Sequence, residues 1–458
     1  MKPRRSKSAP RKVAKPQLKR PVPASPKLVQ IEKPIYGGAF LAHAEGKAVF
    51  VPLTLPGEQA QVRITEDKRG YAKAEVAEIV SAAPERIAPA CRHFGACGGC
   101  HYQHTGYETQ LAFKQAILSE TLERGGVRAP DEISVLAAAT ESQSWAYRNR
   151  IRLAFDAEGK PGYRGRRSHA VIPIAECPIA APLLVKAAQS FTEVARQFSP
   201  LLRPTEISLF CNAGEDSLLA SLFTASASKG SFDDFGRALA EQIPALKGVE
   251  LVVEGHNGER NPAQSPHTIA QWGEASLAYR AAGFDYRVDH GAFFQVNRWL
   301  VDELVDAVVG AGREGKLAWD LFAGVGLFAR KLTAGFARVV AVESAPSATA
   351  ALAANLRGTT GSAVRASTLD FLRRNSKAQR PDLVVVDPPR IGLGTEITAL
   401  LAEIAAPELV YVSCDPATLA RDLRALLASG YAIESLTLAD LFPQTFHLET
   451  VVHLRRAC

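Results

Sequence analysis

Alternating apolar and polar positions near the beginning of the chain predict a small β-barrel. Between residues 31 and 84, three segments place apolar side chains at every second position, which is the spacing of half-buried strands; they are 48–51, 60–64 and 74–79. Turn signals separate these segments at Gly37-Gly38, Gly46, Pro56-Gly57 and Gly70. Small barrels of this kind often bind RNA, but a simple accessory barrel fits the pattern equally well.

The last third of the chain alternates between apolar strand-like segments and helical segments. From about residue 293, the strand-like segments are 317–322, 338–342, 383–386 and 409–412, and the helical ones are 330–332, 347–356, 400–404 and 416–427. Strands that alternate with helices predict an α/β domain in which helices cover both faces of a parallel sheet. Functional residues of such a sheet lie at the carboxyl ends of its strands.

The region between these two domains has a weaker pattern. Residues 107–124 predict a helix, because Gly125-Gly126 directly after them is a helix-stop signal. Residues 133–286 mix strand-like and helix-like stretches, and their arrangement does not follow from the sequence. We therefore divide the chain into a tail at 1–28, a β-barrel at 29–85, a central domain at 86–290 and an α/β domain at 291–458.

The positive charge of the chain is concentrated in its tail. The formal net charge is +7, and the residues before Glu32 include ten Lys and Arg but no acid, so the remainder is slightly acidic. The tail is also rich in Pro and Ser, which predicts a disordered arm that binds a polyanion such as RNA. A solvated tail without a specific role and an organellar transit peptide are the alternatives. No apolar run of about 18 residues predicts a membrane span, and no secretory signal peptide is recognisable.

The cysteines predict a metal centre rather than disulfides. An odd number, seven, in a long chain without a signal peptide favours a reducing cytoplasm over a disulfide framework. Cys91, Cys97 and Cys100 are grouped, and Cys177 follows far downstream, so the chain supplies four thiolates. Such a set fits a [4Fe–4S] cluster or a structural zinc site. Three grouped ligands and a remote one followed by Pro178 favour the cluster, and cysteines without a ligand are the third possibility.

A glycine-rich loop follows the first strand of the α/β domain. Asp320 stands at the strand end, and Gly324 and Gly326 allow the tight turn and the close approach of a ligand. Glu343 ends the next strand, where an acid can hold the ribose hydroxyls of a nucleoside. The loop also satisfies a dinucleotide fingerprint, but Asp320 and the later strand ends favour S-adenosylmethionine.

Three later stretches place reactive residues at successive strand ends. They are Asp387-Pro388-Pro389-Arg390, Ser413-Cys414-Asp415-Pro416 and the segment 442–449, which ends in Glu449. Methylation of uracil C5 needs a thiolate that adds to C6 and a base that removes the C5 proton. Cys414 and Glu449 meet these two requirements. Taken singly, a buried cysteine, a surface carboxylate and a rigid Pro-Pro turn would explain the same residues.

These motifs together resemble the bacterial RNA uridine-C5 methyltransferases, and among them the iron–sulfur branch that acts on 23S ribosomal RNA. The resemblance covers about residues 30–458 and rests on five motifs in their order: Phe293-Phe294-Gln295-Val296-Asn297, the loop 320–326, Asp387-Pro388-Pro389-Arg390, Ser413-Cys414-Asp415-Pro416-Ala417-Thr418-Leu419 and His447-Leu448-Glu449-Thr450. It implies a class I (Rossmann-like) methyltransferase domain, an N-terminal TRAM-like β-barrel and a central iron–sulfur domain.

The resemblance also implies the roles of single residues. Cys414 would be the nucleophile and Glu449 the base. The residues expected around S-adenosylmethionine are Gln295, Phe322, Gly324, Gly326, Glu343 and Asp387, and those expected to bind the cluster are Cys91, Cys97, Cys100 and Cys177. The chain departs from the family at Ala323, where the family often has Cys, and at Leu327, where a polar residue often contacts the cofactor.

We therefore expect an enzyme that methylates C5 of a uridine in RNA. Ribosomal RNA is the preferred substrate because of the four cysteines, and tRNA is the alternative within the same chemistry. A cytosine-C5 methyltransferase and a non-catalytic RNA-binding iron–sulfur protein are the competing hypotheses. The target base has to leave its stack to react. We further expect a monomer in the cytoplasm, with no membrane association.

Overall fold

The structure is a computed structural model, which describes residues 25–198, 204–225, 232–253 and 267–456. The chain divides into two compact units, Met1–Lys33 with Ala39–Ala83 and Pro34–Gly38 with Pro84–Cys458. Residues 1–24, which make up most of the predicted basic tail, lie outside the described part of the chain. Binding of a polyanion by that tail therefore stays a prediction.

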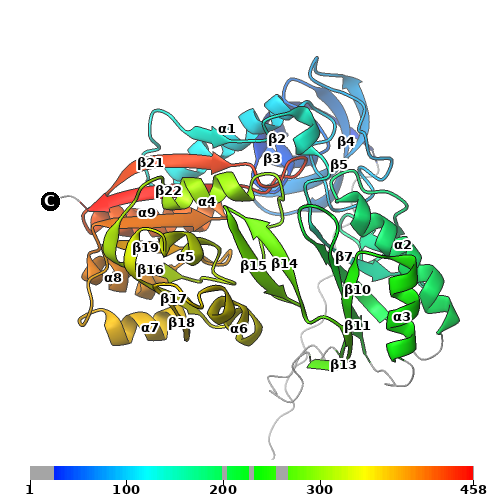
Figure 1. Cartoon of the computed structure of the whole chain (residues 1–458). Coiled ribbons are helices and arrows are strands. Elements are labelled where there is room, and N and C mark those ends of the chain that lie inside the picture. Colours follow the sequence, from blue (N-terminus) through cyan, green and yellow to red (C-terminus); the bar gives the residue numbers. More distant parts are fainter. Residues whose placement is uncertain (1–24, 199–203, 226–231, 254–266, 457–458) are drawn as a thin grey trace, which may run out of the picture. The chain divides into compact units, whose positions relative to one another are not determined.

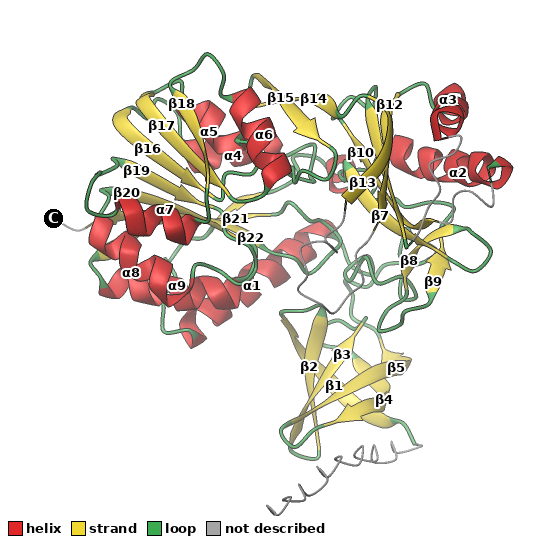
Figure 2. Cartoon of the chain, turned by 90° about the horizontal axis from the view of Figure 1, so that it is seen from below, coloured by secondary structure: helices red, strands yellow, loops and turns green. Residues whose placement is uncertain are grey.

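The first unit is a closed barrel with the strand order β1-β2-β3-β5-β4. Its strands, labelled in Figure 2, are β1 (Lys27–Ile35), β2 (Ala39–Ala44), β3 (Lys47–Pro52), β4 (Gln59–Asp67) and β5 (Tyr71–Ser81). Alternate side chains point inward, and Phe40, Val49 and Val62 are buried in the barrel core. The three predicted strand segments lie within β3, β4 and β5, so the prediction of a small barrel is confirmed.

The second unit contains an eight-stranded sheet with the order β18-β17-β16-β19-β20-β22-β21-β6. Its strands are β6 (Ser134–Leu136), β16 (Gly315–Leu321), β17 (Phe336–Glu343), β18 (Gly361–Arg365), β19 (Leu383–Val386), β20 (Glu408–Ser413), β21 (Tyr431–Ala439) and β22 (Glu449–Arg456). From β18 to β20 all neighbours are parallel. The inner strands are unbroken apolar runs because both faces of the sheet are covered.

Helices lie on both faces of this sheet, as Figure 2 shows. One face packs against α4 (Val301–Val309), α5 (Leu327–Leu332) and α6 (Pro346–Asn355), and the other against α1 (Tyr107–Arg124), α7 (Thr368–Asn375), α8 (Gly394–Ile404) and α9 (Pro416–Ala428). Successive residues of β16 alternate between the two cores, with Ala318 in the first and Trp319 in the second. The predicted α/β arrangement is confirmed. None of the helices in the described residues is long and apolar enough to cross a membrane.

The sheet is not parallel throughout, which differs from the sequence prediction. Strand β22 runs antiparallel to both β20 and β21. The connection from β21 to β22 spans only residues 440–448, and a parallel return would need a crossover of about a dozen residues or more. Glu449 therefore stands at the amino end of a strand. The antiparallel direction nevertheless brings it to the sheet edge where β20 ends.

A second sheet, which the sequence did not predict, fills most of the central region. Its order is β13-β12-β11-β10-β7-β8-β9, and its core packs against α2 (Pro182–Gln197) and α3 (Phe232–Gln242) (Figure 1). The strands are β7 (Arg150–Phe155), β8 (Pro161–Arg164), β9 (Val171–Pro173), β10 (Pro204–Cys211), β11 (Leu218–Thr224), β12 (Leu246–Val253) and β13 (His267–Gly273). The hairpin of β14 (Ser276–Ala281) and β15 (Phe284–Asp289) adds Tyr279 and Tyr286 to the core of the eight-stranded sheet.

Candidate active site

A pocket of about 330 Å³ opens at the carboxyl end of β16. Four of the residues predicted to contact the cofactor line this pocket: Gln295, Phe322, Gly324 and Asp387. Leu327, where the family often has a polar residue, lines it as well. The exposed ring of Phe293 adds an apolar wall. The pocket thus combines an apolar lining with a few polar groups, as cofactor sites usually do.

The loop after β16 needs its glycines. Gly324 and Gly326 have φ angles of +56° and +91°, in the left-handed region that L residues rarely adopt. A Cβ atom at Gly326 would also come within 2.6 Å of the Cδ1 atom of Leu352. Phe322 has a φ of +65° without being a glycine, a strained conformation that is typical of functional sites.

Two acids fix this loop and leave one oxygen free. Glu343 accepts hydrogen bonds from the backbone N–H of Gly324, at 3.0 Å, and of Ser344, at 2.7 Å. Asp320 is fully buried, and its Oδ2 accepts from the backbone N–H of Ala329 at 2.8 Å, whereas its Oδ1 has no hydrogen-bond partner. Burial raises the pKa of Asp320 to about 7. A buried oxygen without a partner is costly unless a ligand pairs with it, so these residues fit a bound nucleoside cofactor.

Cys414 and Glu449 stand at neighbouring strand ends. In the antiparallel pair of β20 and β22, Ser413 lies opposite Thr450, so Cys414 and Glu449 are the next two residues at that edge. The hydroxyl of Thr450 donates to the carbonyl oxygen of Ser413 at 3.1 Å and closes the end of the ladder. Asp387 directly follows β19, which pairs with β16 on one side and β20 on the other. The edge therefore places Asp387 between the cofactor loop and Cys414.

The electrostatics of this edge favour protonated groups. Burial and the nearby carboxyl of Asp387 raise the pKa of Glu449 well above its usual value, and burial raises the pKa of Asp387 to about 7. Burial, followed by the charges of Glu449 and Asp387, raises the pKa of the Cys414 thiol to about 12, while Arg390 lowers it. Surrounded by protein groups alone, Cys414 keeps its proton at neutral pH. A reactive thiolate therefore requires additional positive charge nearby.

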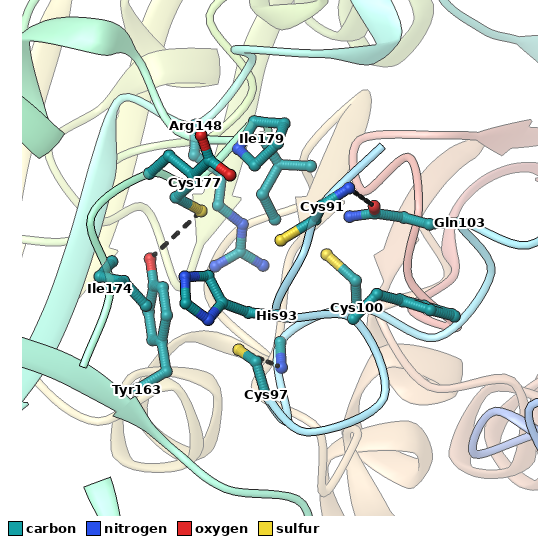
Figure 3. Close-up of a pocket in the computed structure, with 14 residues that line it drawn as sticks. Cys91, His93, Cys97, Cys100, Gln103, Arg148, Tyr163, Ile174, Cys177 and Ile179 are labelled. Carbon is teal, nitrogen blue, oxygen red and sulfur yellow. Dashed lines mark hydrogen bonds between the residues drawn. The ribbon is translucent and has the colours of Figure 1, made fainter. Parts of the chain in front are cut away.

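The four cysteines that the sequence predicts as cluster ligands line one cavity. Its volume is about 480 Å³, and its walls include Cys91, Cys97, Cys100 and Cys177. Figure 3 shows the four sulfur atoms turned toward a common space, together with the guanidinium group of Arg148.

The four cysteines do not form a metal-binding group as they lie in the structure, so the expected iron–sulfur cluster stays a prediction. In the described part of the chain, no three His, Cys, Asp or Glu side chains are close enough to hold a metal ion. Burial raises the pKa of Cys97 and Cys177, and raises that of Cys100 to about 12. Cys211 is fully buried against α2 and α3, and Cys458 lies outside the described residues.

Two family models match the chain. The model for tRNA (Uracil-5-)-methyltransferases matches residues 271–457, and the model for the TRAM domain matches residues 26–77. The first match includes the cofactor loop and the edge with Cys414 and Glu449. The second covers most of the barrel.

Curated relatives match nearly the whole chain. The 23S rRNA (uracil(1939)-C(5))-methyltransferase RlmD of Shewanella woodyi is 31% identical over 96% of this chain and 97% of its own length. An uncharacterized RNA methyltransferase of Thermotoga maritima is 30% identical over 93% of this chain and 98% of its own. The chain belongs to the RNA (uracil-C5) methyltransferase family. The predicted activity, methyl transfer from S-adenosylmethionine to C5 of a uracil in RNA, is thereby confirmed.

A solved structure shares the methyltransferase fold. The tRNA (uracil-54, C5)-methyltransferase of Pyrococcus abyssi, in complex with S-adenosyl-L-homocysteine, superposes with a TM-score of 0.75 and covers 93% of this chain and 99% of its own. Its sequence is 24% identical, so the likeness concerns the fold alone.

The structure brings together most of the residues expected from the sequence, but three contacts at the edge with Cys414 and Glu449 were not expected. Arg390 Nη2 lies 3.0 Å from His447 Nδ1. The hydroxyl of Tyr36, in the segment Pro34–Gly38 of the second unit, donates to the carbonyl oxygen of Cys414 at 3.3 Å. The Tyr36 ring packs edge-on against Phe446, with 5.5 Å between centroids. Arg390 and His447 belong to motifs found in the sequence, whereas Tyr36 had no sequence signal.

Proposed function

We propose that this enzyme methylates C5 of one uridine in 23S ribosomal RNA, with Cys414 as the nucleophile and Glu449 as the base. The observation that carries the proposal is the position of both residues at neighbouring strand ends beside the cofactor pocket. The choice of RNA follows relatives such as those of Shewanella woodyi and Halomonas elongata, whose names specify uracil 1939 of 23S rRNA.

The cofactor would be held by the predicted set of residues. Gln295, Phe322 and Asp387 line the pocket, and Glu343 and the unpaired Oδ1 of Asp320 are the acids available for hydroxyl and amino groups. Bound S-adenosylmethionine supplies an electrophilic methyl group on a sulfonium. Arg390 lowers the pKa of Cys414, and the positive charge of the sulfonium would act in the same direction.

The reaction then proceeds through a covalent adduct on the uracil ring. After the thiol has released its proton to solvent, the Cys414 thiolate adds to C6, and the electron pair of the C5–C6 bond makes C5 nucleophilic. C5 forms its bond to the methyl carbon while the bond from that carbon to sulfur breaks. Glu449, as a carboxylate, takes the C5 proton, and the electron pair of that C–H bond re-forms the C5–C6 bond as Cys414 leaves. The uridine has to be flipped out of its stack to reach this edge.

We also propose that Cys91, Cys97, Cys100 and Cys177 bind a [4Fe–4S] cluster. Four thiolates are the ligand set of such a cluster, and these four line one cavity of about 480 Å³. The guanidinium of Arg148, buried in the same cavity, suits the negative charge of a tetrathiolate cluster.

A structural role for the cluster segment fits its contacts with the catalytic edge. The backbone N–H groups of His101 and Tyr102 donate to the carbonyl oxygen of Gln444, at 2.8 and 3.1 Å. Gln444 lies five residues before Glu449. The segment that holds Cys100 is therefore tied directly to the loop that leads to the proposed base.

The remaining expectations concern the organisation of the enzyme. The division at 29–85, 86–290 and 291–458 into an RNA-binding TRAM barrel, a cluster domain and a catalytic domain is part of the proposal. The monomeric state and the cytoplasmic location stay predictions from the sequence.

The test is methyl transfer from labelled S-adenosylmethionine by protein that is purified anaerobically. Unmodified 23S rRNA and unmodified tRNA are the two substrates, with Cys414→Ala as the inactive variant and Cys211→Ala, a buried cysteine away from the edge, as its control. The proposal expects 5-methyluridine in 23S rRNA, none with Cys414→Ala, and an activity near that of the wild type with Cys211→Ala. If the label appears only in tRNA, the substrate is tRNA and not 23S rRNA. If the product is 5-methylcytosine, the enzyme methylates cytosine and not uracil. RNA binding without any label would refute the catalytic roles.

A further inference from the structure

A second, smaller pocket lies between the central sheet and the segment that leads to the cofactor pocket. It encloses about 200 Å³. Arg150 of β7, Ser208 and Phe210 of β10, Ser221 of β11 and His290 after β15 are among its lining residues. None of these residues takes part in the proposed chemistry. The lining is mostly polar, which is unusual for a pocket that only packs.

Arg150 is a buried cation without a counter-ion. Its guanidinium carbon lies 4.2 Å from the centre of the Phe210 ring, and its Nε atom has no hydrogen-bond partner. Burial lowers the pKa of Arg150 to about 10, and no acidic group contributes to that shift. Burying a charge without a partner is expensive. A buried cation is retained where another group, such as a ligand, balances its positive charge.

Asp289 lines the pocket and Glu250 lies next to His290, but both acids have other partners. Asp289 pairs with the Nε of Arg287 at 2.6 Å. Glu250 accepts hydrogen bonds from the hydroxyls of Ser221 and Thr268, each at 2.7 Å. They therefore leave Arg150 uncompensated.

His290 presents a second unpaired group to the same space. Its side chain is only 6% exposed. Its Nδ1 lies 3.2 Å from the hydroxyl of Ser221 and 3.7 Å from Glu250, whereas its Nε2 has no partner. Because the Ser221 hydroxyl donates to Glu250, its oxygen accepts from Nδ1–H of His290, and Nε2 is a second donor in the doubly protonated ring. In that form the pocket offers two donors, Arg150 and His290, to one ligand.

The pocket adjoins the cofactor site through short connections. The side-chain amide of Asn149, next to Arg150, donates to the carbonyl oxygen of Gln295 at 2.9 Å. The rings of Phe210 and Phe294 have centroids 6.3 Å apart, and Phe294 lines the cofactor pocket. A ligand held by Arg150 would therefore lie next to residues that line the cofactor pocket.

We infer that the Arg150–His290 pocket binds a backbone phosphate of the substrate RNA, close to the flipped uridine. A phosphodiester carries the negative charge that Arg150 lacks and accepts hydrogen bonds from both donors. Most contacts of a protein with a nucleic acid go to phosphates, and they set the register of the strand. The inference rests on the proposed function, because it assumes that RNA is the substrate.

The test compares Arg150→Gln with Arg152→Gln. Arg152 is the matched control: it stands two residues further along β7 and lies over an aromatic ring, Phe223, at 4.1 Å, but it pairs with Glu206. The probe is a transcribed 23S rRNA fragment that carries the target uridine, and its dissociation constant is measured over a range of salt concentrations. Arg150→Gln should weaken binding about ten-fold. It should also reduce the slope of log K against log salt by about 0.7–0.9. Arg152→Gln should leave the slope near that of the wild type.

Two further measurements separate a ligand role from a structural one. Since Arg150 has no counter-ion in the fold, Arg150→Gln should be at least as stable as the wild type in thermal melting and should bind S-adenosylmethionine normally. A lower melting temperature with an unchanged RNA slope would overturn the inference and make the Arg150–Phe210 contact structural. An unchanged RNA affinity in a variant of normal stability would overturn it too. If the wild type methylates no RNA, the proposed function fails separately, because the salt slopes are measured by binding alone.

Discussion

Lys114 and Asp440 form a fully buried ion pair, and removing one partner should destabilise the enzyme strongly. Neither side chain is exposed to solvent, and Lys114 Nζ lies 2.5 Å from Asp440 Oδ1. Lys114 also donates to the carbonyl oxygen of Phe442 at 3.0 Å, so it joins α1 to the connection between β21 and β22. Burial lowers the pKa of Lys114, while Asp440 raises it.

The magnitude follows from the desolvation of the two charges. Lys114→Met leaves the carboxylate of Asp440 buried without a cation, which should cost about 3–5 kcal/mol of unfolding free energy. Asp440→Leu should cost a similar amount for the converse reason. The double variant leaves no buried charge, and replacing both partners of such a pair by apolar residues is often neutral. It should therefore recover most of the loss.

The assay is urea unfolding at pH 7, followed by fluorescence. It is applied to the wild type, both single variants and the double variant, which together form a double-mutant cycle. Glu120→Gln is the control, since it changes an exposed charge on the same helix. If each single variant loses less than about 1 kcal/mol, or if the double variant loses the sum of both, the pair is not a coupled buried ion pair and the reasoning fails.

Four more outcomes are expected. Glu449→Gln should accumulate an RNA–protein adduct that resists denaturation and is visible on gels, because the C5 proton stays in place. Cys414→Ala should form no adduct, and adducts in both variants would contradict the assigned roles. Asp387→Asn should shift the pH profile of Cys414 alkylation to lower pH, because the carboxylate of Asp387 raises the pKa of the thiol. Alkylation is measured on the Cys414 peptide by mass spectrometry, and an unchanged profile would contradict this effect of Asp387. The pKa of Asp320 rises from 3.8 in the unfolded chain to about 7 in the fold, so the free energy of unfolding should fall between pH 4 and pH 7, by about 4 kcal/mol at most. The fall should be smaller in Asp320→Asn. If the free energy of unfolding depends on pH equally in both proteins, Asp320 is not the cause. Protein purified anaerobically should contain about four iron atoms per chain. Cys100→Ser should lose this iron and Cys211→Ala should keep it. Bound zinc in place of iron would contradict the cluster.

The parts of the fold that the sequence predicts are those with strong local patterns. The segment 383–386 is four consecutive buried apolar residues, and a parallel strand covered on both faces must be apolar on both. The helix Tyr107–Arg124 has the predicted bounds because Gly126, with a φ of +78°, ends it. The barrel follows from alternation between closely spaced turns. In each case the signal lies within a few residues.

Features that depend on distant parts of the chain were not predictable in this way. The direction of β22 is fixed by its pairing with β20 and β21, and no local pattern encodes that pairing. The candidate catalytic residues were found because their motifs stand next to predictable strands. Arg150 had a weaker signal. It shares one face of β7 with Arg152, and Ile151 lies on the other face, but only the fold shows that Arg152 has a carboxylate partner.

The contacts of Gln444 explain why the catalytic edge depends on residues so far apart in the sequence. The side-chain amide of Gln110, on α1, donates to Gln444 Oε1 and to the carbonyl oxygens of Tyr102 and Thr105. Its own Oε1 accepts from the backbone N–H of Gln444. A single buried glutamine thus joins the cysteine segment, α1 and the connection that leads to Glu449. Because a buried amide that loses one partner costs about 1–3 kcal/mol, a shift of the cysteine segment cannot leave this connection unchanged. The proposed cluster would therefore influence the proposed base through hydrogen bonds, without any part in the chemistry.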